Sequence, residues 1–195
     1  GPMPALEMLI AEMIALHFCS DRDESINVLS DLLDEAKIRI ANGTGVLPKE
    51  SVKVFWVNPV ADLCVMNLLE QCGGRICGTD YLFMHALDEI PEDLPPMEAL
   101  ARIALADPMA GNSYDRATRI CEDIQTFGAE AVIISRIPGA SHCATEGVII
   151  GDMVRKRLDL PVVEIEVPPI TDALQANLST RIQALIETVN ERRKI

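Results

Sequence analysis

The fold of this chain is decided by residues 131–147, AVIISRIPGASHCATEG. Residues 131–134 are apolar and rich in β-branched side chains, a composition typical of a buried strand. Pro138 and Gly139 stop this strand, and an apolar helical periodicity begins near Cys143. We therefore expect a strand that passes through a short loop into a helix, with a cysteine at the junction.

The position of Cys143 favours chemistry at its sulfur. Ser141 is placed to cap the helix, and Cys143 then falls in the first helical turn. Unpaired N–H groups and the positive end of the helix dipole both favour the thiolate, which is the nucleophilic and metal-binding form. A half-buried structural cysteine fits the spacing equally well, because free cysteine is often buried.

Apolar periodicity predicts the other elements along the chain. Helices are expected at residues 4–18, 24–41, 63–72, 97–106, 114–127, from Cys143 onward and at 171–193, and strands at 52–57, 75–78, 131–134 and 162–167. Residues 80–98 are acidic and proline-rich, as in a surface loop. The last strand alternates between apolar and charged residues, which indicates an edge position.

Strands that alternate with helices predict an α/β fold: a four-stranded parallel sheet with helices on both faces, in a flavodoxin- or Rossmann-like three-layer arrangement. A helical pair at residues 3–45 precedes the α/β domain, which we assign to residues 51–195. Gly1 and Pro2 before Met3 are typical of the scar left when a protease removes an expression tag.

Composition narrows the classes of function. The 195 residues carry a formal charge of −13, which argues against a nucleic-acid partner. No apolar run approaches the ~18 residues of a membrane span. With six cysteines and no signal peptide, we expect reduced thiols and a cytoplasmic location. Neither GxGxxG nor GxxxxGK[ST] occurs, so the sequence indicates neither a dinucleotide site nor an ATPase activity of its own.

Ligands of open parallel sheets bind at the carboxyl ends of the strands, near the switch in strand order. This rule selects the loops at residues 58–62, 78–81 and 136–143. Asn58 and Arg136 are placed there to bind a phosphate or a carbonyl, although capping and turn formation would explain them equally well.

The neighbours of Cys143 do not complete a site by themselves. Adjacent side chains usually point apart, so His142 and Cys143 form a poor nucleophilic dyad, and we favour a metal or cluster ligand. Cys77 is expected at the carboxyl end of its strand, where it could reach the same crevice, although its contribution stays open. We expect Cys64, Cys121 and His85 to pack in the core, and Glu146 to interact with the dipole of its own helix.

Several segments form a recognisable pattern: Asp107-Pro108-Met109, Arg116 and Arg119 on a helix, GAEAVI at 128–133, Ser141-His142-Cys143, LPVVEIE at 160–166 and TRIQALIE at 180–187. From about Ser51 onward the chain resembles the C-terminal portion of 2-hydroxyacyl-CoA dehydratase subunits, such as the D-component of 2-hydroxyglutaryl-CoA dehydratase. The same superfamily contains the subunits of ATP-dependent benzoyl-CoA reductase. The closing helix is the most specific part of the resemblance.

The resemblance implies the radical-type removal of water from a 2-hydroxyacyl-CoA. In that family each such subunit binds a [4Fe-4S] cluster through three cysteines, and Cys143 matches the one from the C-terminal domain. The implied partners are an acyl-CoA substrate, a homologous second subunit in a heterodimer and a separate ATP-dependent activator protein. Asn58, Arg136, Ser141 and His142 would line the substrate cavity, and no residue is assigned as catalytic.

The chain departs from the family pattern because the domain with the other two cluster cysteines is not present. We therefore expect the chain alone to fold, to lack a stable cluster and to be inactive. A truncated chain and a naturally short relative both fit, and the acyl-CoA is not specified. The alternatives are a benzoyl-CoA reductase-type subunit and a non-catalytic assembly or electron-transfer relative. A flavodoxin-like FMN domain is disfavoured, because residues 58–62 offer no Ser- or Gly-rich phosphate cradle.

Overall fold

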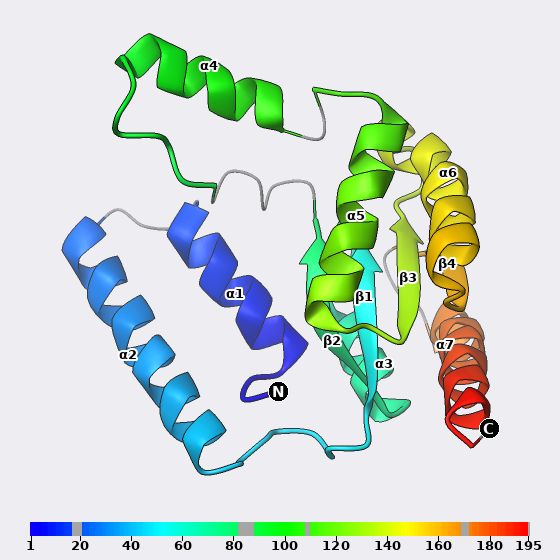
Figure 1. Ribbon diagram of the computed structural model, residues 1–195. Coiled ribbons are helices and arrows are strands. Elements are labelled where there is room, and N and C mark those ends of the chain that lie inside the picture. Colours follow the sequence, from blue (N-terminus) through cyan, green and yellow to red (C-terminus); the bar gives the residue numbers. More distant parts are fainter. Residues whose placement is uncertain (17–20, 82–87, 108–109, 169–171, 195) are drawn as a thin grey trace.

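The computed structural model describes residues 1–16, 21–81, 88–107, 110–168 and 172–194, with the backbone alone at 141–144 and 172–173 (Figure 1). The strands are β1 (Val52–Val57), β2 (Gly74–Asp80), β3 (Ala131–Arg136) and β4 (Val162–Glu166). The helices are α1 (Ala5–Leu16), α2 (Arg22–Ala41), α3 (Cys64–Gln71), α4 (Pro96–Ala106), α5 (Ser113–Phe127), α6 (Ser141–Leu158) and α7 (Asp172–Arg192). The predicted α/β class and the N-terminal helical pair are confirmed.

The four strands form one parallel sheet in the order β2-β1-β3-β4. β1 and β3 occupy the centre, and their side chains are buried on both faces, as expected for a parallel sheet covered by helices. β4 lies at one edge, as its alternating sequence predicted.

Helices cover both faces of the sheet. On one face, α1, α3 and α7 enclose a core that includes Val54 and Trp56 of β1, and on the other face α5 and α6 enclose Phe55 and Val57. α1 lies between α2 and the rest of the molecule (Figure 1). α2 itself buries no residue among those described, and its apolar side chains are exposed or only partly covered.

The connections place the switch in strand order between β1 and β3. The chain leaves β1 toward α3 on one face of the sheet and leaves β3 toward α6 on the other. Loops that depart to opposite faces leave a crevice between them, and ligands of such sheets bind there. The loops that follow Val57 and Arg136 therefore frame the expected binding region.

Two cysteines do not lie where we predicted. β2 continues past Gly78 to Asp80, so Cys77 lies within the strand, as the additional residue of a bulge between the pairs Val54–Ile76 and Phe55–Gly78. Gly78 is not a strand end: a Cβ atom there would come within 2.7 Å of Phe127, so the glycine permits close packing. Cys64 is exposed at the start of α3 rather than buried, whereas Cys121 is buried as predicted.

Candidate functional site

A buried arginine lies at the carboxyl edge of the sheet. Arg116 belongs to the inward face of α5, where it recurs at helical spacing with Ile120 and Ile124. Its side chain is only 1% exposed. A guanidinium that is removed from water must be paired and hydrogen-bonded, because its desolvation is otherwise costly.

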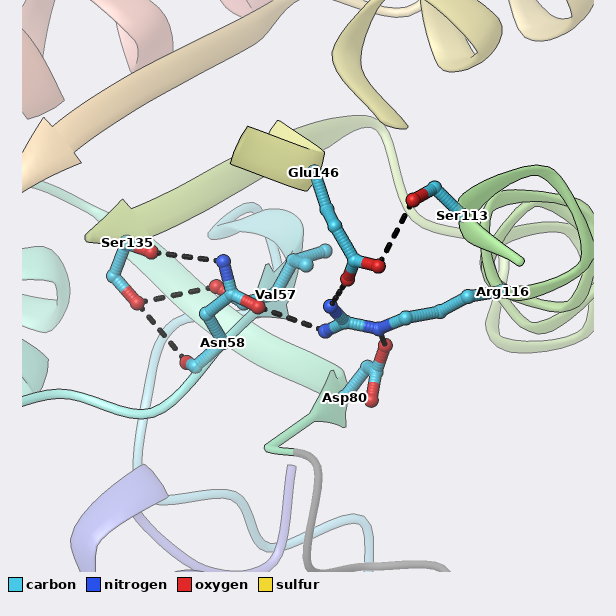
Figure 2. A network of polar contacts seen from close by, with 7 residues as sticks. All are labelled: Val57, Asn58, Asp80, Ser113, Arg116, Ser135 and Glu146. Carbon is cyan, nitrogen blue, oxygen red and sulfur yellow. Dashed lines mark hydrogen bonds and ion pairs between the residues drawn. The ribbon is translucent and has the colours of Figure 1, made fainter. Parts of the chain in front are cut away.

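Three polar side chains from three different parts of the chain surround this guanidinium (Figure 2). Arg116 Nε donates to Asp80 Oδ2 at 3.0 Å, one terminal nitrogen donates to Glu146 Oε2 at 2.5 Å, and the other donates to Asn58 Oδ1 at 2.7 Å. Asp80 ends β2, Glu146 belongs to α6 and Asn58 follows β1. The fork-shaped guanidinium thus ties together elements that lie far apart in the sequence.

Asn58 connects the ends of the three neighbouring strands. It is fully buried and has a positive φ of 71°, a conformation that asparagine tolerates better than most residues. Its backbone N–H donates to the carbonyl of Asp80 at 2.8 Å, and its amide nitrogen donates to the carbonyl of Ser135 at 3.0 Å. The chain is therefore held in its sharp turn after β1 from both sides.

Ser135 supports the same turn from β3. Its hydroxyl accepts a hydrogen bond from Trp56 Nε1 at 3.0 Å. The hydroxyl also lies 3.1, 3.0 and 2.9 Å from the carbonyl oxygens of Val57, Asn58 and Pro59, and its single proton can serve one of them at a time. Since Ser135 is fully buried, it fixes the turn and does not face a ligand.

Glu146 does not have the role that we expected. It is the sixth residue of α6, beyond the first turn, and its carboxylate binds Arg116 and accepts a hydrogen bond from Ser113 Oγ at 3.0 Å. The strongly charged guanidinium competes better for this carboxylate than the helix dipole does. Glu146 thereby joins α6 to α5.

Arg136 is the last residue of β3 and lies next to β4. One of its terminal nitrogens donates to Glu166 Oε1 at 3.2 Å, its register partner, and its Nε lies 3.9 Å from Glu164 Oε2. About a third of the side chain is exposed. The arginine is therefore accessible to a ligand, although two carboxylates already balance its charge.

The first turn of α6 carries the predicted Ser141, His142 and Cys143. Ala140 precedes the first helical residue, so Ser141 lies within the helix and the prediction that it caps the helix is wrong. Gly139, with a φ of +86°, turns the backbone into the helix. The side chains of Ser141, His142 and Cys143, and all of Cys19 and His85, lie outside the described residues.

Comparison with known proteins agrees with the resemblance in the sequence. The model of the family 2-hydroxyglutaryl-CoA dehydratase, D-component, matches residues 1–189. The chain belongs to this family. The match also includes α1 and α2, which the resemblance from about Ser51 onward did not cover. No curated protein matches the chain.

Membership of the D-component family raises the question of a metal site, because its dehydratases depend on iron–sulfur clusters. Within the described part of the chain, no group of three or more His, Cys, Asp or Glu side chains could hold a metal ion. Nor does any helix in that part have the length and apolar character to cross a membrane.

The described cysteines are also poor ligands in this D-component chain. Burial raises the pKa of the Cys77 thiol to about 11, and its Sγ lies 3.5 Å from the carbonyl oxygen of Val54. Burial likewise raises the pKa of Cys121, and a hydrogen bond with Asp62 raises that of Cys64. Cys72 lies against Ser179 of α7. A cluster needs thiolates that converge, so these residues do not fit one by themselves.

Sequence reasoning missed the central residue of this D-component site. Arg116 entered only as part of the family pattern, although a signal was available: it shares the inward face of an amphipathic helix with Ile120 and Ile124. An arginine on such a face requires acidic partners. The sequence did not reveal which carboxylates would meet it, because Asp80 and Glu146 are 36 and 30 residues away.

Proposed function

We propose that this chain is a component of a 2-hydroxyacyl-CoA dehydratase, in which Cys143 provides one ligand of a [4Fe-4S] cluster. The family match over residues 1–189 supports the dehydratase class and is the observation that carries the proposal. The place of Cys143 in the first turn of α6, beside the switch in strand order, supports its role as a ligand.

We propose, on the basis of the family, that the other two ligands of such a cluster come from a further domain, since the described residues by themselves contain no group of three metal-binding side chains. When bound, the cluster would supply a low-potential electron for the removal of water. On the basis of the family, we further propose that the chain works with a homologous second subunit and a separate ATP-dependent activator protein.

The described residues hold the binding region in shape. Arg116 and its partners fix the turn after β1 and join α5 to α6, whose first turn carries Cys143. Asn58 is fully buried and both ends of its amide are engaged within the protein, so it supports the binding region rather than contacts the acyl-CoA. Arg136 is accessible at the edge, where it can bind a phosphate or carbonyl of the thioester. Ser141 and His142 line the same region.

The test is Cys143→Ala in the complete enzyme, with Cys64→Ala as the matched control. We expect Cys143→Ala to lower the iron and sulfide content, the visible absorption of the cluster and the dehydration of 2-hydroxyacyl-CoA together. Cys64→Ala removes an exposed thiol and should leave all of these unchanged. A Cys143→Ala enzyme with full iron and sulfide content would refute the role of Cys143.

A further inference from the structure

An apolar cavity of about 550 Å³ opens beside the turn that follows β1. Ile10 and Met13 of α1 form one wall, Val60 after β1 and Met66 of α3 form another, and Tyr81 after β2 contributes a third. Its volume lies in the range of about 300–1,000 Å³ that small-molecule sites occupy. Methionine side chains adapt to apolar ligands of different shapes.

The cavity is joined to the candidate site. Pro59, another of its lining residues, directly follows Asn58, and its carbonyl oxygen lies 2.9 Å from Ser135 Oγ. Tyr81 directly follows Asp80, the carboxylate that binds Arg116. The polar network therefore fixes two walls of the cavity at the edge of the sheet where ligands bind.

The surroundings of the cavity disfavour an acyl chain that carries a negative charge. None of the described lining residues is a lysine or arginine. Burial and the nearby Glu12 raise the pKa of Tyr81. Burial raises the pKa of Glu12 itself to about 7, and its Oε2 has no hydrogen-bond partner among the described residues. A carboxylate in this cavity would find no lysine or arginine among the described lining residues, so its removal from water would be costly.

We infer that this cavity takes the apolar acyl chain of a CoA thioester. The substrate is then a monocarboxylic acyl-CoA with an aliphatic or aromatic side chain, in contrast to the dicarboxylic 2-hydroxyglutaryl-CoA in the name of the family. This inference rests on the proposed function for the binding of an acyl-CoA. It adds the class of acyl chain, which the family match does not specify.

The first experiment measures binding to the 195-residue chain by calorimetry, with hexanoyl-CoA, glutaryl-CoA and free CoA as the probes. Each methylene buried in an apolar cavity strengthens binding by about fourfold. We therefore expect hexanoyl-CoA to bind at least about tenfold more tightly than glutaryl-CoA, which carries a charge at the far end of its chain.

Two pairs of variants locate the binding. Ile10→Trp fills the mouth of the cavity at a half-exposed position and should weaken hexanoyl-CoA binding by about tenfold. Ile40→Trp makes the same change on the exposed side of α2 and should have no effect. Val60→Lys places a cation in the cavity and should strengthen glutaryl-CoA binding relative to hexanoyl-CoA, whereas Val46→Lys in the exposed loop before β1 should not.

The outcomes separate this inference from the proposed function. Equal binding of both thioesters, unchanged in Ile10→Trp, would overturn the apolar acyl cavity and leave the acyl-CoA function standing. No binding of either thioester or of CoA would overturn both the inference and the acyl-CoA part of the function. Loss of hexanoyl-CoA binding in Ile10→Trp, with free CoA unaffected, supports the inference.

Discussion

Arg116 and Asp80 form an ion pair that is almost completely enclosed: Nε donates to Oδ2 at 3.0 Å, and the two side chains are 1% and 5% exposed. The pair joins α5 to the end of β2, at the edge where the candidate site lies. Such a pair is costly to break, because removal of one partner leaves the other charge buried without its counterion. Its role is therefore accessible to measurement.

The first prediction concerns this pair. Arg116→Met deprives the buried Asp80 carboxylate of its guanidinium and should lower the free energy of unfolding by about 3–5 kcal/mol. Urea denaturation followed by circular dichroism measures the change. Arg119→Met is the matched control, because Arg119 lies one turn further along α5 in a half-exposed pair with Asp88 at 3.3 Å. It should cost no more than about 1 kcal/mol. Equal costs for both variants would contradict the structural role of Arg116.

The second prediction concerns the turn at Asn58. Asn58→Gly and Asn58→Ala both remove the hydrogen bonds with Arg116 and Ser135, but alanine is also strained at a φ of 71°. Asn58→Ala should therefore be less stable than Asn58→Gly by about 1 kcal/mol.

Asp159 provides the control for this backbone effect. It ends α6 with a φ of 53°, and its side chain is almost fully exposed. Glycine and alanine at Asp159 should differ by a similar amount, although neither substitution removes a buried hydrogen bond. If alanine and glycine at Asn58 were equally stable in urea denaturation, the strained turn would be refuted.

The third prediction concerns pH. The pKa of Glu12 is raised by burial from its ordinary value of 4.5 to about 7, so the folded chain holds this proton more tightly than the unfolded chain does. Stability is therefore lost as the pH rises from about 4.5 through 7. Glu12→Gln does not titrate, so its stability relative to the wild type should rise by about 1–2 kcal/mol between pH 5 and pH 8, after allowance for partial exposure.

Thermal or urea unfolding of both proteins across this range measures the effect of Glu12. Glu7→Gln, which removes another carboxylate from the same helix, is the matched control. A Glu12→Gln profile parallel to that of the wild type would show that Glu12 titrates normally in the folded chain.

Much of the fold was predictable because periodicity reports burial. The apolar runs of β1 and β3 and the alternation of β4 indicated two central strands and an edge strand, and the helical stretches followed the expected spacing. The predicted end of β2 at Gly78 was wrong, because the tight contact with Phe55 and Phe127 requires a glycine within the strand.

Only the location of the candidate site could be predicted from the sequence. The rule for parallel sheets identified the loops at the carboxyl edge, and Asn58 does belong to the polar network there. The identity of its partners depends on which distant side chains the fold brings together. Arg116, Asp80 and Glu146 meet through packing between separate elements, which no local pattern reports.

The last prediction concerns Cys77 and Cys64, whose positions we predicted wrongly from the sequence. Cys77 lies in the bulge of β2 with its pKa raised to about 11, so it forms almost no thiolate near neutral pH. Cys64 is exposed at the start of α3 and therefore open to a thiol reagent. In the folded chain at pH 8, Cys64→Ser should lower the number of thiols that react rapidly with Ellman's reagent by one, whereas Cys77→Ser should leave that number unchanged. In urea both substitutions should remove one reactive thiol. Rapid labelling of Cys77 in the folded chain would show that it is accessible as a thiolate, and would restore it as a candidate ligand at the carboxyl edge.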